Sequence, residues 1–225
     1  MTSINNNDMD SSSSKQWEEL PLKLNQRRAL HGAVVLPNNN ILITGGYARG
    51  VCLTSVEEID ITNTATPTTA FPALSTKRSE HASVLLNNAA CIMGGWDEYN
   101  YLSTVHHIDV TNPYPGWQNS TNMNQRRSGC AAASHGSIIF VFGGDDGNDY
   151  LSTAEFLDTA NPENGWTRIQ NQMTTGRSAH SVVTIGAMMY IIGGHDNNHN
   201  ELNSVEIFNT ATKTFAAGPS LPLPI

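Results

Sequence analysis

The sequence predicts an all-β protein made of four copies of one unit, and two observations carry that prediction. A glycine pair recurs, beginning at Gly45, Gly94, Gly143 and Gly193, so that the steps between copies are 49, 49 and 50 residues. Between these pairs the apolar runs are short and rich in β-branched and aromatic residues, and no window keeps a helical period. A fixed period of this length indicates a repeat architecture. A small sheet flanked by copies of itself is a blade, so the predicted fold is a β-propeller.

Three further markers hold the same register in every copy. An arginine precedes each glycine pair by 16 or 17 residues. A short motif follows the glycine pair after about 12 residues, and an aromatic residue closes the unit. In chain order these markers are Arg28, Arg78, Arg127 and Arg177, then SVEEID, TVHHID, TAEFLD and SVEIFN, then Phe71, Trp117, Trp166 and Phe215. Four markers in register over four units exclude a chance match.

Each unit is expected to contain four short strands. The first follows the arginine, the second ends at the glycine pair, the third carries the short motif and the fourth carries the aromatic residue. The second strand, for example MMYII before Gly193, is apolar on both faces, so its sheet must be covered on both sides. The glycine pair is expected to need positive φ or a close backbone approach where this strand leaves the sheet.

The repeats divide the chain into blades at about 28–74, 78–123, 127–173 and 177–221. Residues 1–14 are polar, rich in Asn and Ser and without pattern, which predicts a disordered tail. Residues 15–24 resemble a last outer strand without the rest of its blade. The chain is therefore expected to form an incomplete propeller, an unusually small ring or half of an assembly. An open ring would expose apolar blade faces and favour self-association.

The pattern R-S-x-H, an apolar strand, GG, S/T-x-E and a tryptophan resembles the kelch repeat over residues 17–225. The resemblance implies a kelch-type β-propeller whose loop-bearing face binds partners, usually proteins, as in substrate adaptors of ubiquitin ligases and in scaffolds. Some positions depart from the pattern. Phe71 and Phe215 replace the tryptophan, His106 replaces the glutamate and Cys130 replaces the histidine.

Composition limits the function further. The chain has 225 residues, a formal net charge of −8 and a pI near 5.4, which argue against nucleic acid or an anionic membrane as partner. No apolar run approaches the roughly 20 residues of a membrane span. The N-terminus lacks the features of a secretory signal. Three cysteines without a C-x-x-C pair suit reduced thiols, so a cytoplasmic location, or the nucleus, is expected.

The strongest binding candidates are the repeat arginines. The resemblance places them near the central channel, where they would form an exposed basic ring with the serines that follow three of them. A guanidinium fork binds carboxylates bidentately, so an acidic peptide or loop of another protein is the expected ligand. In the alternative interpretation the arginines bind turn carbonyls and neighbouring acids. The candidate residues are Arg28, Arg78, Ser79, Arg127, Ser128, Arg177 and Ser178.

The loops that follow the glycine pairs differ where the rest repeats, which is typical of a specific surface on a common scaffold. The first loop is basic and the other three are acidic. The aromatic and arginine side chains that dominate interface energetics are present among them. The candidate loop residues are Tyr47, Arg49, Trp96, Tyr99, Asp145 and His195.

Catalytic chemistry is not indicated. Glu57, Glu155 and Glu206 recur in strand register and are expected to accept hydrogen bonds from backbone amides rather than to act in a mechanism. The register of His31, His81, His180 and Cys130 does not predict convergence on a metal. We expect no catalytic residue, no metal and no cofactor. The alternative, an enzyme like the sugar-isomerising, mutarotase-like or copper-oxidase propellers, would need acids, bases and arginines converging in an axial pocket.

Overall fold

The computed structural model describes residues 22–63 and 68–224 of the chain. Its strands form four four-stranded antiparallel sheets and one two-stranded ribbon, which confirms the predicted all-β architecture of four repeated blades. The predicted tail at 1–14 lies outside the described residues. So does most of the predicted strand at 15–24, and its described part, residues 22–24, forms no strand. Within the described residues, no helix is long and apolar enough to cross a membrane.

Each blade is a meander in which neighbouring strands pair. The first blade contains β1 (Gly32–Val35), β2 (Ile41–Thr44), β5 (Val56–Ile59) and β6 (Thr68–Phe71). The second contains β7 (Ala82–Leu86), β8 (Ala89–Met93), β9 (Val105–Asp109) and β10 (Gln118–Asn119). The third contains β11 (Ala131–His135), β12 (Ile138–Phe142), β13 (Ala154–Asp158) and β14 (Thr167–Arg168). The fourth contains β15 (Ser181–Ile185), β16 (Met188–Ile192), β17 (Val205–Asn209) and β18 (Thr214–Ala217).

Two small elements complete the fold. A ribbon of β3 (Tyr47–Ala48) and β4 (Val51–Cys52) forms the loop after the first glycine pair. A short 3₁₀ helix, η1 (Pro162–Asn164), lies between β13 and β14. The ribbon begins directly after Gly46. Its Tyr47 forms a backbone bridge with Ala29, as Trp96 does with Ser79 in the second blade.

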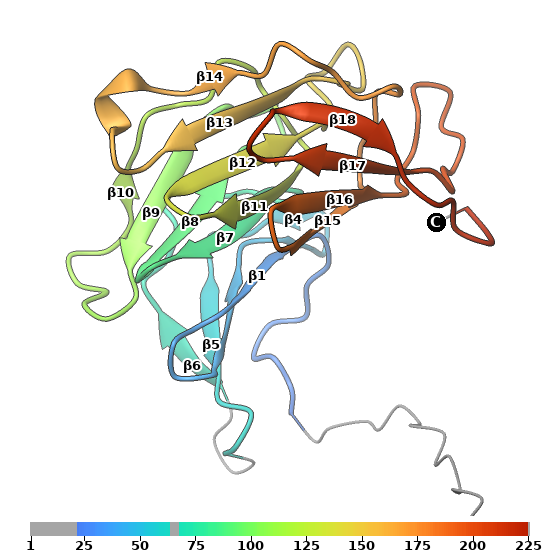
Figure 1. Ribbon diagram of the computed structural model, residues 1–225. Coiled ribbons are helices and arrows are strands. Elements are labelled where there is room, and N and C mark those ends of the chain that lie inside the picture. The colour runs from blue at the N-terminus through green and yellow to red at the C-terminus, as the bar shows by residue number, and fades with distance from the viewer. Residues whose placement is uncertain (1–21, 64–67, 225) are drawn as a thin grey trace, which may run out of the picture.

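The blades fan about a common centre, and the ring is not closed (Figure 1). Successive innermost strands contact one another, β1 with β7, β7 with β11 and β11 with β15. A series of backbone hydrogen bonds follows the same path. Glu80 N donates to Leu30 O, Gly129 N to Glu80 O and Ala179 N to Gly129 O, each at 2.8 Å. These bonds fix the inner ends of all four blades relative to one another.

The glycine pairs have the expected backbone geometry. Gly94 and Gly95 have φ of 68° and 96°, and Gly143 and Gly144 have φ of 58° and 95°. A Cβ on Gly143 would lie 2.5 Å from the carbonyl oxygen of Arg177 in the next blade. The pairs therefore let the backbone of one blade approach the next blade more closely than any side chain would allow.

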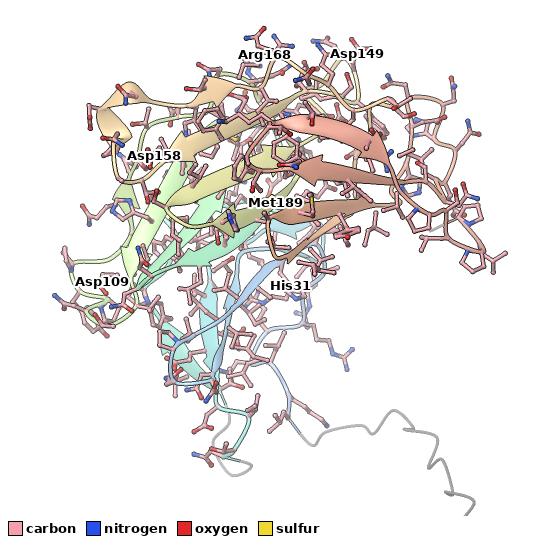
Figure 2. All side chains as sticks on the ribbon, viewed as in Figure 1. His31, Asp109, Asp149, Asp158, Arg168 and Met189 are labelled. Carbon is pink, nitrogen blue, oxygen red and sulfur yellow. The ribbon has the colours of Figure 1, made fainter. Side chains whose placement is uncertain are left out.

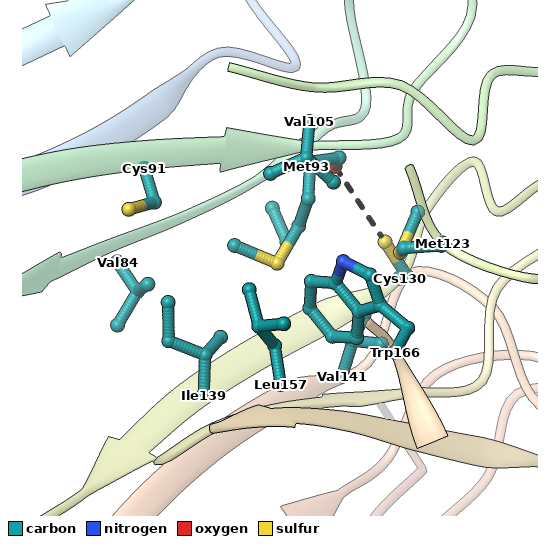
Figure 3. Packing of buried hydrophobic residues seen from close by; sticks show 11 residues of the cluster. Val84, Cys91, Met93, Val105, Met123, Cys130, Ile139, Val141, Leu157 and Trp166 are labelled. Carbon is teal, nitrogen blue, oxygen red and sulfur yellow. Dashed lines mark hydrogen bonds between the residues drawn. The ribbon is translucent and has the colours of Figure 1, made fainter. Parts of the chain in front are cut away.

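The core lies between blades, where apolar residues of one sheet meet those of the next. Figure 3 shows the contact of the second and third blades, in which Met93 packs against Leu157 and Trp166. The third blade presents Phe140 and Phe142 to the fourth. On the opposite face of each sheet, matching residues pack against the preceding blade. They are Ala90, Ile92 and Ile108 in the second blade, Ile139, Val141 and Leu157 in the third, and Met189, Ile191 and Phe208 in the fourth.

In the described part of the chain, the first and fourth blades each pack against one neighbouring blade only, so apolar residues on the other face of each sheet are exposed. In the fourth blade, Val183 stands where Ala133 stands in the third, and 45 % of its surface is exposed. Ile185 on the same strand is 62 % exposed. In the first blade, Val35 is 61 % exposed. The open ring therefore leaves apolar sheet surface in water at a cost of about 25 cal/mol per Å².

Candidate functional site

The repeat arginines bind the blade itself. Arg127 is fully buried, and its Nη1 donates to the carbonyl oxygens of Gly143 and Thr153 at 2.7 and 2.9 Å. Its Nη2 lies 3.0 Å from Oε1 of Glu155. The arginine thus binds the carbonyl of the glycine pair and an acid on the third strand of the same blade.

The same contacts recur in two other blades. Arg28 pairs with Glu57 and donates to Gly45 O, and Arg177 pairs with Glu206 at 2.9 Å and donates to Gly193 O. The side chains of all three arginines are completely shielded from solvent. Their geometry is that of the alternative interpretation, in which the arginines satisfy turn carbonyls and neighbouring acids.

Arg78 lacks the acid. His106 takes the glutamate position in the second blade, and its Nδ1 lies 3.5 Å from Nη2 of Arg78. Arg78 still donates to Gly94 O at 2.8 Å, but its Nε has no partner in the described part of the chain. Burial lowers the pKa of Arg78 to about 10. Burial, followed by the charges of Arg78 and His107, lowers the pKa of His106 to about 4.

The expectation that these arginines form an exposed ring was therefore wrong. Arg78, Arg127 and Arg177 are 0 % exposed. The burial of the arginines does not follow from the sequence pattern, because the groups that bind each guanidinium lie 16 to 29 residues after it in the chain. The serines beside them are buried as well: Ser79, Ser128 and Ser178.

The glutamates are the acceptors that the sequence predicted. Glu155 accepts hydrogen bonds from the backbone amides of Asn124 and Gln125, at 2.8 and 3.2 Å. Glu57 accepts from Asn25 and Gln26 in the same way. These carboxylates therefore anchor the connector that enters each blade, and their role in the described fold is structural.

A cavity of about 530 Å³ opens at the centre of the ring, and all four blades line it. Glu80 and Asp145 supply two carboxylates, and Trp96, Tyr101 and Tyr150 supply aromatic surface. Backbone bridges join Ser79 to Trp96, Trp96 to Tyr101, Ser128 to Asp145 and Asp145 to Tyr150, so this face repeats the same ladder around the centre. Of the candidates chosen from sequence, Trp96, Asp145, Ser178 and His195 meet here.

The cavity residues that were not among the candidates include one acid and two aromatic residues, Glu80, Tyr101 and Tyr150. A signal for Glu80 exists in the repeat. It is the variable residue of R-S-x-H, where the other copies have Leu30, Gly129 and Ala179, and it is the only charged residue among these four. Tyr101 and Tyr150 occupy matching places in the second and third loops. Comparing the copies position by position would have found all three.

A second, larger groove of about 880 Å³ lies on the first blade. Arg27, Arg28, Tyr47 and Arg49 line it, together with the connector at Leu24–Gln26. Arg27 and Arg49 are exposed, unlike the repeat arginines. This groove therefore contains exposed guanidinium groups beside an aromatic ring.

The groove and the central cavity are connected by two of the loop candidates. The rings of Tyr47 and Trp96 lie 6.3 Å apart and tilted, which joins the groove to the central cavity. Tyr99 is 80 % exposed, and Nζ of Lys77 lies 5.2 Å from its ring centroid. Together, Tyr47, Arg49, Trp96, Tyr99, Asp145 and His195 form what we call the loop face.

The described residues contain no group of three or more His, Cys, Asp or Glu side chains placed to hold a metal ion. Glu80 is hydrogen-bonded to the hydroxyl of Ser128 at 2.6 Å rather than to Asp145. No arginine or lysine is among the described residues that line the central cavity. The convergence of acid, base and arginine that the enzyme alternative requires is therefore not seen in this cavity.

Comparison with known proteins decides the family. The model of the KLHDC2/KLHL20/DRC7 Kelch-repeats domain matches residues 5–173 and 117–220. The chain belongs to the kelch-repeat family. Kelch-repeat domains are in general protein-interaction modules. In this kelch chain an Arg–Glu pair recurs in the first, third and fourth blades, and the glycine pairs have positive φ. No curated protein matches the chain significantly.

Proposed function

We propose that this kelch domain is a non-catalytic interaction module that binds a partner protein on its loop face. The observation that carries the proposal is the groove on the first blade. It combines two exposed guanidinium groups, Arg27 and Arg49, with the ring of Tyr47. Exposed arginine forks bind carboxylates bidentately, and tyrosine and arginine are enriched at the energetic centres of interfaces.

An acidic peptide or loop of the partner is the ligand that this groove fits. The repeat arginines support that binding indirectly, since they hold the glycine pairs from which the loops emerge. Arg28 itself lines the groove, but its guanidinium is engaged with Glu57 and Gly45. The binding charge is therefore assigned to Arg27 and Arg49. The three cysteines are buried and free, which fits a reducing compartment such as the cytosol or nucleus.

The test uses the full chain and two acetylated peptides of equal length, one with alternating Glu and Gly and one with alternating Gln and Gly. The Glu peptide should bind at least about tenfold more tightly, as expected for charge-assisted hydrogen bonds from two arginines. The Arg27→Ala/Arg49→Ala variant should lose that preference and melt like the wild type. Arg168→Ala is the matched control, because Arg168 projects from β14 at the outer edge of the third blade (Figure 2).

Equal binding of both peptides, or an unchanged preference in the double variant, would remove the groove from the proposal. A tagged chain that captures the same proteins with and without Arg27, Tyr47 and Arg49 would overturn the loop face as the binding site.

We also propose that the open blade faces associate with those of a second copy. The fourth blade presents Val183 and Tyr190 where the third blade presents Ala133 and Phe140 to its neighbour. The first blade presents Val35, Ile41 and Ile59 on the face where the second blade receives such a contact with Ala90 and Ile108. One chain thus carries both halves of an interface that it already forms three times, which favours head-to-tail pairing.

A further inference from the structure

The central cavity has a different charge from the groove on the first blade. Its two ionisable acids are Glu80 and Asp145, and neither has a salt-bridge partner among residues 22–63 and 68–224. One oxygen of each is held by the fold, because Ser128 Oγ donates to Glu80 at 2.6 Å and Gly147 N donates to Asp145 at 2.8 Å. The fold thus orients two carboxylates into a cavity without neutralising them.

Two of the histidines that line the cavity, His81 and His180, do not supply the missing positive charge. His81 and His180 are buried, and desolvation, followed by nearby arginines, lowers the pKa of each to about 3. Both imidazoles are therefore neutral at physiological pH. Nε2 of His81 bonds with Thr44 Oγ1 at 2.8 Å, but its Nδ1 has no partner among the described residues although the side chain is 95 % shielded.

Aromatic rings form the rest of the wall. Trp96, Tyr101 and Tyr150 line the cavity beside the two acids. Burial and then the negative charges of Asp145 and Glu80 raise the pKa of Tyr101 and of Tyr150. The two carboxylates therefore lie close to both phenol groups. Negative charge next to aromatic faces is the surrounding that attracts an alkylammonium or guanidinium group.

The backbone at Glu80 supports a role beyond packing. Glu80 has φ of 57°, and the matching residues Leu30, Gly129 and Ala179 have φ of 54°, 62° and 56°. This left-handed conformation suits glycine best, and a longer side chain there costs about 1 kcal/mol or more. The second blade nevertheless places a carboxylate at this position, the innermost point of the ring. The same backbone conformation recurs in all four copies, so the conformation belongs to the fold and only the carboxylate is particular to the second blade.

We propose that the central cavity binds a basic side chain, lysine or arginine, of the partner polypeptide, between Glu80, Asp145 and the aromatic wall. This inference rests on the proposed function, since it names a second feature of the same partner. The partner would then present an acidic segment to the groove on the first blade and a basic residue to the cavity. The Tyr47–Trp96 ring pair lies between the two sites.

The test is an NMR titration of the full chain with N-acetyl-arginine amide, and separately with N-acetyl-citrulline amide. Citrulline has nearly the same shape without the charge. The arginine compound should shift the Trp96 indole and Gly129 amide signals and bind at least about tenfold more tightly than the citrulline compound. Glu80→Gln/Asp145→Asn should remove this difference. Asp149→Asn is the matched control, because Asp149 is exposed in the same loop as Asp145 but lies outside the cavity.

Two results would overturn the inference: equal binding of both compounds, or undiminished arginine binding by the double variant. The single variants Asp145→Asn and Glu80→Gln, checked by thermal melting, replace the double variant if it does not fold. The outcome is separable from the proposed function. A chain that binds the Glu peptide through Arg27 and Arg49 but does not distinguish arginine from citrulline keeps the groove and loses only the cavity assignment.

Discussion

Arg127 and Glu155 form an ion pair with 3.0 Å between Nη2 and Oε1, and both side chains are at most 1 % exposed. Removing the arginine would leave Glu155 buried without its counter-ion and the carbonyl of Gly143 without its donor. Arg127→Ala should therefore lower the free energy of unfolding by about 3–5 kcal/mol, measured by urea denaturation. Arg168→Ala, at an exposed site on β14, should change it by less than about 0.5 kcal/mol. Equal stability of the two variants would contradict the structural role of the pair.

His106→Glu should stabilise the protein. It would give Arg78 the carboxylate partner that Arg127 has, and it would offer acceptors to the amides of Ser75 and Thr76, which match Asn124 and Gln125. We expect a gain of about 1 kcal/mol at pH 7, by urea denaturation. His107→Glu adds the same charge one residue further along β9, where the side chain points to the opposite face of the sheet. A gain of the same size in this control would show that the Arg78 contact is not the cause.

Stability should fall as the pH drops below about 6.5. The pKa of His106 is lowered to about 4 and those of His81 and His180 to about 3, mainly by burial. Between these values and 6.5 the unfolded chain binds more protons than the folded one, so acid favours unfolding. Each histidine contributes up to about 1.4 kcal/mol per pH unit in this window. Urea denaturation at pH 7.5, 6 and 5 measures the slope, and His180→Gln should make it shallower. An unchanged slope in that variant would show that His180 does not titrate as described.

Gly143→Val should prevent folding, because φ of 58° disfavours a β-branched residue and its Cβ would collide with Arg177 O. Yield of soluble protein and a cooperative melt are the measurements. Gly136 also has positive φ, of 60°, but a Cβ there would meet no atom within 4 Å. Gly136→Asn should therefore fold normally. A cooperatively melting Gly143→Val variant would contradict the close approach of the two blades.

The open blade faces should make the chain self-associate with rising concentration, as seen by sedimentation velocity. Ile185→Lys on the fourth blade and Val35→Lys on the first should each weaken association, since a charge would be buried in the contact. Tyr114→Lys is the control, because Tyr114 is 75 % exposed and lies in a turn outside the strands. A monomer at all concentrations would refute head-to-tail pairing.

The repeat made most of the fold predictable. Gly94 and Gly143 were placed at positive φ from sequence, and Glu57 and Glu155 were assigned as acceptors for backbone amides, because each copy tests the same local rule again. Strand length and alternation are local properties, so the sheets β7–β10 and β11–β14 follow from spacing alone. The environment of Arg127 does not follow in this way, since strands from elsewhere in the blade must close over it.

The sequence by itself determined the number of blades, the order of their strands and the residues that turn at each glycine pair. Only the tertiary structure decided that Arg78 and Arg177 are buried while Arg27 and Arg49 are exposed. It also decided that Glu80 and Asp145, 65 positions apart by their numbers, line one cavity. The physical reason is that hydrogen-bonded pairing within a blade depends on neighbours in the chain, whereas charge burial and cavity composition depend on how four separate blades converge at the centre of the ring.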